Sequence, residues 1–199
     1  MSDQQPGLRE RTRRAVQNEI GAAALALFVS RGYDATTIDD IAAAVGMSQR
    51  SVFRYFATKE EIVVGKFDLG TEDMLGLLRA RPADEPVWTS LRRLFDILDN
   101  SDAQELSKPI NQVVLETPAL LAVYLQRLHS LQGGVAAVLR ERAEAAGKPY
   151  AAEDLTPRAL SAAAFGCLVA AQHAWLSSES GESLAPYIDR AMTTLVPRD

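Results

Sequence analysis

Residues 46–56 read GMSQRSVFRYF, a glycine turn followed by a short polar segment with two arginines and three aromatics. Ser48 is suited to cap a helix beginning at Gln49, because a serine side chain accepts a hydrogen bond from a backbone N–H of the first turn. Val52 and Phe56 are four residues apart and therefore share one face of that helix. The segment predicts a short helix with one buried face and a polar face that is left for another partner.

A second short helix is predicted immediately before this one. Thr36 and Thr37 each have an acidic residue three positions later, which is the spacing of a capping box, and Ile41 begins a buried apolar stripe. Gly46 ends this helix. Two short helices joined by a tight turn form the helix-turn-helix motif, which places its second helix in the major groove of DNA. We assign this motif to residues 37–56.

Side chains able to contact DNA remain on the other faces of the second of these helices. Glutamine can hydrogen-bond adenine, arginine can bond guanine O6 and N7, serine can reach a base or a phosphate, and an aromatic ring can contact a thymine methyl. Side chains at the flanks of the helix are better placed to bind phosphates. The residues predicted to face bases are Gln49, Arg50, Ser51 and Phe53, and those predicted to bind phosphates are Arg54, Tyr55 and Lys59.

The charge of the chain is unevenly distributed. The 199 residues carry a net charge of −5, which argues against a protein that coats nucleic acid over its whole surface. Residues 1–60 nevertheless have eight Lys or Arg against seven Asp or Glu, so the N-terminal third is the part suited to approach a polyanion. Arg11, Arg13 and Arg14 form either a basic arm for the adjacent groove or phosphates, or a terminus that is basic for solubility alone.

The whole sequence has the periodicity of an all-α protein of about nine helices. Apolar residues recur at helical spacing, prolines fall near expected helix ends, and alternating strand patterns with Asn-Gly or Asp-Gly turns are absent. With 47% hydrophobic residues, the chain can form one core or a small domain joined to a larger one. Besides the two short helices, helices are predicted at about 9–31, 59–80, 87–99, 103–116, 119–146, 157–177 and 184–196.

The run ALFVSRGYDATTIDDIAAAVGMSQRSVFRYFATKEEI, residues 26–62, carries an ordered set of features. These features are Phe28, Gly32-Tyr33, Thr36-Thr37, Gly46-Met47-Ser48, the aromatic segment from Phe53 to Phe56, and Lys59-Glu60. In this order they resemble the N-terminal domain of the tetracycline-repressor (TetR) family of bacterial transcription regulators, and the resemblance covers residues 15–62.

The resemblance implies a DNA-binding domain at 9–57 and a ligand-binding and dimerisation domain at 58–199. It implies that Thr37 contacts a phosphate, that Gln49, Arg50 and Ser51 face bases, and that Tyr55 and Lys59 hold the DNA backbone; Ser48 is included in this DNA-contacting set. Many relatives have a small residue at the position of Arg50 and a tyrosine at that of Phe53. We therefore expect Arg50 to specify one G·C pair in each half-site.

The larger C-terminal part has the apolar faces of a helical body, and most of these residues are expected to form its core. The resemblance implies a small-molecule cavity among these helices, for which we select Phe67, Trp88, Phe95, Val113, Tyr124, Leu128 and His173. Gly133-Gly134 lies inside a predicted helix, where each glycine costs about 1 kcal/mol relative to alanine. The pair marks a bend, space for a ligand, or space for a neighbouring helix.

The last two predicted helices are rich in small residues, which allow helices to approach closely. Paired across a two-fold axis, four such helices form a bundle, and this is the dimer that the resemblance implies. The alternative is that both helices complete the core of a monomer. The selected interface residues are Ala163, Cys167, Ala170, Trp175, Leu184, Ile188 and Leu195. A dimer requires a palindromic operator whose half-sites lie about 34 Å apart.

Few residues suit catalysis or metal binding. His129 and His173 lie on separate predicted helices, and Cys167, the only cysteine, lies in an apolar helix, so we expect no metal, no cofactor and no enzymatic activity. A single cysteine fits a reducing cytoplasm. The longest apolar run, residues 20–29, is too short to span a bilayer, so a soluble cytoplasmic protein without a membrane partner is expected.

The sequence therefore predicts a ligand-responsive DNA-binding transcriptional regulator. We expect a repressor that binds a palindromic operator as a homodimer and is released by a small apolar or amphipathic effector. The alternative is a helical small-molecule carrier or enzyme whose N-terminal helices only pack, and such a protein would show no salt-dependent binding to a defined operator. The identity of the effector, the operator sequence, the target genes and the choice between repression and activation are not encoded in any motif of the chain.

Overall fold

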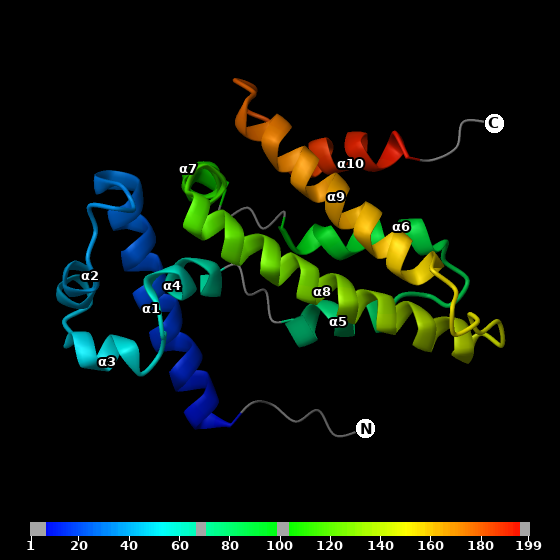
Figure 1. Cartoon of the computed structure of the whole chain (residues 1–199), viewed down its shortest axis with the longest axis horizontal. Helices are drawn as coiled ribbons and strands as arrows, with labels where there is room; N and C mark the ends of the chain where they lie inside the picture. The colour runs from blue at the N-terminus through cyan, green and yellow to red at the C-terminus, as the bar shows by residue number, and fades with distance from the viewer. Residues whose placement is uncertain (1–6, 67–70, 99–103, 196–199) are drawn as a thin grey trace. The chain divides into compact units, whose positions relative to one another are not determined.

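The computed structural model describes residues 7–66, 71–98 and 104–195, and within these ranges it is all-helical (Figure 1). The α-helices are α1 (Leu8–Arg31), α2 (Ile38–Ala44), α3 (Gln49–Phe53), α4 (Lys59–Lys66), α5 (Thr71–Arg79), α6 (Val87–Leu94), α7 (Gln104–Glu116), α8 (Pro118–Ala145), α9 (Thr156–Leu176) and α10 (Ala185–Thr193). A 3₁₀ helix, η1 (Phe95–Leu98), follows α6. The predicted all-α class is confirmed.

The chain divides into two compact units, of which the first comprises residues 1–68 and 112–124 and the second residues 69–111 and 125–199. In the first unit, α1 packs against α2 and α4, and α2 packs against α3. Ile20, Phe28, Ile41 and Val52 are buried at this junction. The long helix α1 is therefore the support on which the short helices α2 and α3 are held.

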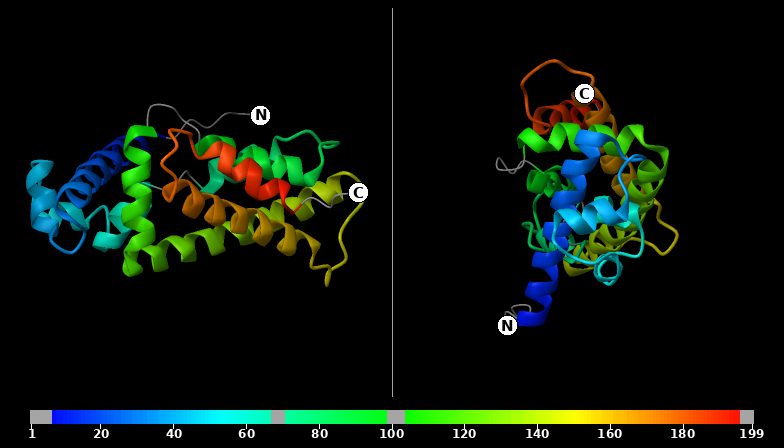
Figure 2. Two further views of the ribbon diagram at one scale, coloured as in Figure 1. Left: turned by 90° about the horizontal axis from the view of Figure 1, so that it is seen from above. Right: turned by 90° about the vertical axis from the view of Figure 1, so that its left-hand side faces the viewer.

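The second unit is organised around α9, which packs against α6 and α10. Phe95 and Phe165 meet edge to face, with ring centroids 5.4 Å apart and an interplanar angle of 90°. Leu91 and Leu94 of α6 and Ile188 of α10 are almost completely buried in this unit. Figure 2 shows α9 and α10 running side by side.

Helix boundaries differ from expectation in four places. Helix α3 ends at Phe53 rather than near Phe56. The predicted helix 59–80 is described as two helices, α4 and α5, and residues 67–70 between them lie outside the described part of the chain. The predicted helix 87–99 tightens after Leu94, because the N–H of Phe95 bonds the carbonyl of Arg92 three residues back, and it continues as η1. The last helix ends at Thr193 rather than near residue 196.

The Gly133-Gly134 pair does not interrupt α8, which is one helix of 28 residues. A Cβ atom added at Gly134 would lie 2.9 Å from Cδ1 of Leu75 on α5, whereas one added at Gly133 would meet no heavy atom within 4 Å. Of the three possibilities left open by the sequence, the structure supports space for a neighbouring helix. Gly134 allows α5 to pack closely against α8.

One described helix, α9, is long and apolar enough to cross a membrane by length and composition alone, with a mean hydropathy of 1.4. The uninterrupted apolar run within α9, residues 162–171, is no longer than the run at residues 20–29. In the structure, 44% of the most apolar window of α9 is buried within the protein. The core helices of soluble proteins have these same properties, so α9 is weak evidence for a membrane segment.

Candidate functional site

The start of α2 is fixed by a complete capping box. The hydroxyl of Thr37 accepts a hydrogen bond of 3.1 Å from the N–H of Asp40, and the Asp40 carboxylate accepts one of 2.8 Å from the N–H of Thr37. The Thr37 hydroxyl also donates to this carboxylate over 2.6 Å. The hydrogen bonds from Thr37 lower the pKa of Asp40. Thr37 is exposed beside this cap, so it is accessible to a ligand at the first turn of α2.

The turn between α2 and α3 has the geometry of a Schellman motif. The N–H of Met47 bonds the carbonyl of Ala42 over 2.8 Å, and the N–H of Gly46 bonds the carbonyl of Ala43 over 3.2 Å. Gly46 has φ +64°, in the left-handed region that favours glycine. This glycine therefore ends α2 and sets the direction in which α3 leaves.

Helix α3 separates its side chains as the spacing predicts. Ser48 caps it, its hydroxyl accepting a hydrogen bond of 3.2 Å from the N–H of Ser51. Val52 is fully buried and Phe56 is 7% exposed, which holds α3 against the rest of the first unit. The side chains of Gln49, Arg50, Phe53 and Arg54 are exposed, and Ser51 is half-buried. Phe53 is 47% exposed, an unusual position for a phenylalanine unless it contacts a partner.

Tyr55 lies where the end of α3 meets α1. Its carbonyl accepts a hydrogen bond of 3.4 Å from the side-chain amide of Gln17, and its ring is half-buried. Sequence reasoning gave Gln17 no role. The sequence gives one local indication of such a role: Gln17 is a polar residue next to Val16, on the side of α1 that is otherwise apolar.

Lys59 is more deeply engaged than expected of a side chain that only binds phosphate. Its ammonium group donates hydrogen bonds of 2.9 Å and 3.1 Å to the carbonyls of Tyr33 and Thr36, and it lies 3.9 Å from the centroid of the Tyr33 ring. Two of its three N–H groups are thus used within the protein. Lys59 joins the start of α4 to the turn that precedes Thr37.

A tyrosine–glutamate contact reinforces this junction. The hydroxyl of Tyr33 donates a short hydrogen bond to the carboxylate of Glu60. Burial and this bond raise the pKa of Tyr33, while the same bond lowers the pKa of Glu60. The turn before α2 is therefore fixed to α4 through adjacent residues, Lys59 and Glu60.

The residues selected for an effector cavity have different environments. Phe67 lies outside the described residues. In the second unit, Phe95 and Leu128 are buried, Trp88 is half-buried, and His173 is exposed in the last turn of α9. In the first unit, Tyr124 is buried and Val113 is half-buried.

Trp88 is the selected residue that lines an open pocket of about 350 Å³ between α6 and α10. Its indole N–H donates to the carbonyl of Met192 over 3.2 Å. The lining residues are Trp88, Thr89, Arg92 and Arg93 from α6 and Asp189, Met192 and Thr193 from α10. The pocket therefore has an indole and a methionine beside charged and hydroxyl groups.

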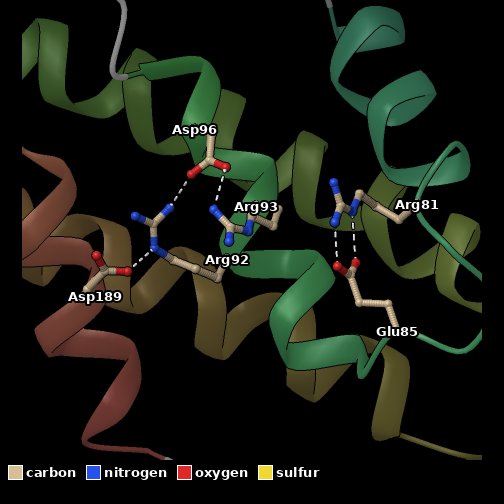
Figure 3. Close-up of polar contacts among 6 residues, drawn as sticks. All are labelled: Arg81, Glu85, Arg92, Arg93, Asp96 and Asp189. Atoms are coloured by element: carbon tan, nitrogen blue, oxygen red, sulfur yellow. Dashed lines mark hydrogen bonds and ion pairs between the residues drawn. The ribbon is translucent and has the colours of Figure 1, made fainter.

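The charged side of this pocket is held by ion pairs (Figure 3). Arg92 pairs with Asp189 on α10 and, over 2.7 Å, with Asp96. Arg93 lies 3.4 Å from the other oxygen of Asp96. The hydrogen bond from Arg92 lowers the pKa of Asp189. Sequence reasoning missed Arg92 and Asp189, although the spacing of Arg92 and Asp96 on one helix face was a visible signal.

The residues selected for a dimer interface divide into two sets. Cys167, Trp175 and Ile188 are buried within a single chain: the thiol of Cys167 contacts the Ala191 carbonyl at 3.5 Å, and the indole of Trp175 donates to the Glu182 carbonyl over 2.9 Å. This is the core role that the sequence left open as an alternative. Ala163 and Leu184 are half-buried, and Ala170 and Leu195 are exposed.

The outer face of α9 is formed by small residues. Ala162, Gly166 and Ala170 are exposed at spacings of four residues, which places them along one side of the helix. Ala163 lies beside them and is half-buried. A second helix could therefore contact this face, whereas it could not reach Cys167, which is buried.

The described residues offer little support for a metal site or a reactive thiol. They contain no group of three His, Cys, Asp or Glu side chains arranged to hold a metal ion. His129 and His173 are exposed on α8 and α9. Burial raises the pKa of the Cys167 thiol, which disfavours the reactive thiolate.

Comparison with protein families gives two matches that follow one another along the chain. Residues 20–64 match the family model described as bacterial regulatory proteins of the tetR family. Residues 85–198, more than half of the chain, match the model described as the MftR C-terminal domain.

Individual relatives are transcriptional regulators. The chain is 34% identical over 146 residues to the HTH-type transcriptional regulator TcmR of Streptomyces glaucescens, and the match covers 69% of this chain and 64% of TcmR. It is 28% identical over 173 residues to the transcriptional regulator MftR of Mycobacterium tuberculosis, covering 85% of this chain and 84% of MftR. These relatives are regulators rather than carriers or enzymes.

Solved structures share the fold at low sequence identity. NalD, the secondary repressor of the MexAB-OprM multidrug efflux pump in Pseudomonas aeruginosa, superposes with a TM-score of 0.62 at 18% identity over 92% of this chain and 96% of NalD. The fatty acid degradation regulator FadR from Bacillus halodurans gives a TM-score of 0.62 at 19% identity over 89% of this chain and 96% of FadR.

Proposed function

The chain belongs to the TetR family of bacterial transcriptional regulators, and from that premise we propose that it is a repressor that binds a palindromic operator as a homodimer and is released by a small effector. The proposed DNA-binding domain comprises residues 9–57, and the proposed effector-binding and dimerisation domain comprises residues 58–199.

The observation that carries the proposal is the exposed face of α3. A capped helix, held by buried Val52 and Phe56, presents Gln49, Arg50 and Phe53 to solvent. Glutamine and arginine are the side chains that read adenine and guanine bidentately, and an exposed aromatic ring suits a thymine methyl. In the proposed complex these side chains and Ser51 contact bases.

Phosphate contacts surround the reading face in this proposal. Thr37 and Ser48 are the exposed N-cap residues of α2 and α3, and their hydroxyl groups are proposed to contact phosphate oxygens. Arg54 and Tyr55 lie at the other end of α3. Lys59 has one N–H left for a phosphate and otherwise positions the turn that leads to Thr37.

Effector binding is assigned to the part of the chain that matches the MftR C-terminal domain. The mixed lining of the pocket beside Trp88 favours a small amphipathic or apolar molecule. Phe95 and Leu128 are also proposed effector contacts. The other proposed effector contacts are Val113, Tyr124 and His173 within this part, and Phe67, which precedes it.

Dimerisation is assigned to α9 and α10. The exposed small residues of α9 allow a helix of a second copy to approach closely, and a two-fold axis makes the same face available on both protomers. Two identical reading helices then require an inverted repeat in the DNA. Because its target is DNA in a bacterium, the proposed place of action is the cytoplasm.

A selection of bound fragments from genomic DNA tests this proposal. The full-length protein is mixed with sheared genomic DNA at two salt concentrations, and the retained fragments are sequenced. The proposal predicts an enriched inverted repeat whose binding weakens as salt rises, because several phosphates are neutralised in each half-site. Retention of fragments without a common sequence would contradict it.

A further inference from the structure

The first turns of α1 are rich in arginine. Residues 8–14 hold four arginines and one glutamate, a net charge of +3 in a chain whose net charge is −5. The described side chains from Leu8 to Ala15 are all exposed, and burial on α1 begins only at Ile20. The family model for the DNA-binding domain also begins at residue 20, so this segment lies outside it.

The position of this segment relative to α3 is set by Gln17, whose side chain bonds the Tyr55 carbonyl at the end of α3. Arg13 and Arg9 lie four and eight residues before Gln17, on the same side of the helix. At 1.5 Å per residue they extend about 6 Å and 12 Å beyond this contact. Figures 1 and 2 show the first turns of α1 running on past the end of α3.

The charges of these arginines are available to an external anion. Among the ion pairs of the described residues, none includes Arg9, Arg11 or Arg13. Arg54, next to Tyr55 at the end of α3, is also exposed. Arginine binds phosphate oxygens through two parallel N–H groups, so this surface suits a polyphosphate backbone.

We propose that Arg9 and Arg13 bind DNA backbone phosphates next to the base pairs that α3 contacts. The inference rests on the proposed function, because it takes α3 as the helix in the major groove. Phosphate contacts of this kind carry no sequence information, but they raise affinity and steepen its dependence on salt. The basic turns of α1 thus extend the DNA-binding surface beyond the helix-turn-helix motif.

The test compares two double variants that remove equal charge. Arg9→Gln with Arg13→Gln removes the proposed contacts, and Lys148→Gln with Arg158→Gln removes two exposed charges from the second unit. Glutamine has nearly the helix propensity of arginine, so α1 is expected to remain folded, which circular dichroism checks. Binding is measured from 50 to 200 mM salt, on the selected operator and on a random-sequence duplex.

The proposal predicts that Arg9→Gln with Arg13→Gln weakens binding to both duplexes by the same factor and leaves the preference for the operator unchanged. Between 50 and 200 mM salt the affinity should fall less steeply, by about 3.5-fold for each phosphate that the variant no longer binds. The Lys148→Gln with Arg158→Gln variant should retain the wild-type slope.

The other possible outcomes contradict either the role of the two arginines or the proposed function itself. Equal slopes for the two double variants would overturn the role of Arg9 and Arg13 and leave the proposed function standing. A loss of operator preference without a change in slope would overturn it as well, since the arginines would then read bases. Failure of the wild-type protein to bind either duplex would overturn the proposed function and, with it, this inference.

Discussion

Lys59 connects three parts of the first unit through one ammonium group. It bonds two carbonyls in the turn between α1 and α2 and lies over the ring of Tyr33, while its own backbone begins α4. Local spacing identified Lys59 as a flanking cation but not these bonds, because their partners are 23 and 26 residues away in the sequence. The burial of Val52 and Phe56, by contrast, was predicted correctly from their spacing of four residues.

Replacing Lys59 by methionine should destabilise the protein. Lys59→Met keeps an unbranched apolar stem but leaves the carbonyls of Tyr33 and Thr36 without their donor, at a cost of about 1–3 kcal/mol. Urea unfolding measures the change, with Arg54→Met as the control because Arg54 is exposed. Equal unfolding midpoints for the two variants would show that the Lys59 bonds contribute no stability.

The ion pair between Arg81 and Glu85 predicts a dependence of stability on pH. Hydrogen bonds from Arg81 and Ser90 hold the pKa of Glu85 at about 2, below its usual value of 4.5. Because the folded pKa is lowered, this stabilisation is present above pH 4.5 and is lost as the pH falls towards 2.

Glu85→Gln should therefore melt below the wild type at pH 6, and the difference should shrink as the pH is lowered through 4.5 towards 2. Thermal melts at several pH values measure this difference. Glu153→Gln, at an exposed acid, should show little difference at any of these pH values. A difference for Glu85→Gln that stays constant over the range would contradict the assignment.

At the level of elements, helix periodicity predicted most helices because it depends on neighbours within a turn or two. The bounds of α1, α2, α8 and α9 lie within about two residues of the prediction, whereas α3 ends at Phe53, three residues before its predicted end. The division of residues 59–80 into α4 and α5 and the 3₁₀ geometry of η1 were not predicted. The sequence left the role of the Gly133-Gly134 pair open among three possibilities, because the neighbour of Gly134, Leu75, comes from a helix about 60 residues away.

The two neighbouring glycines of α8 should respond differently to alanine. Gly133→Ala fills open space and removes the entropic cost of a helical glycine, so it should stabilise by about 0.5–1 kcal/mol. Gly134→Ala adds a Cβ within 2.9 Å of the buried Leu75, which must shift. Overpacking of this kind costs about 1–3 kcal/mol and should make Gly134→Ala the less stable variant. Equal free energies of unfolding would contradict an overpacked contact between the new Cβ at residue 134 and Leu75.

At the level of the whole molecule, the proposed dimer depends on the outer face of α9. Its small residues were visible in the sequence, but the sequence did not separate those that face outward from Cys167, Trp175 and Ile188, which the chain buries itself. Which residues of α9 face outward and which are buried depends on how α9 packs against α10 and α6. The amino-acid composition of the helix alone does not predict this.

A charge on this face should dissociate the dimer. Ala170→Glu places a carboxylate at an exposed position of the chain that becomes buried and unpaired if α9 pairs with a second copy. Sedimentation velocity should then show a monomer, while circular dichroism shows an intact fold. Ala137→Glu, on an exposed position of α8, should leave the oligomeric state unchanged. A dimer that survives Ala170→Glu would place the interface elsewhere.

The central claim is that the exposed face of α3 reads base pairs, and the most direct test repeats the DNA selection with Arg50→Ala beside the wild type. The account predicts the same inverted repeat for both proteins, with the preference for G·C relaxed at one base pair in each half-site. Affinity for the wild-type operator should fall by about 1–3 kcal/mol per contact. Identical sequence preferences with a uniform loss of affinity would make Arg50 a phosphate contact, and the absence of any enriched repeat from the wild-type selection would contradict the account.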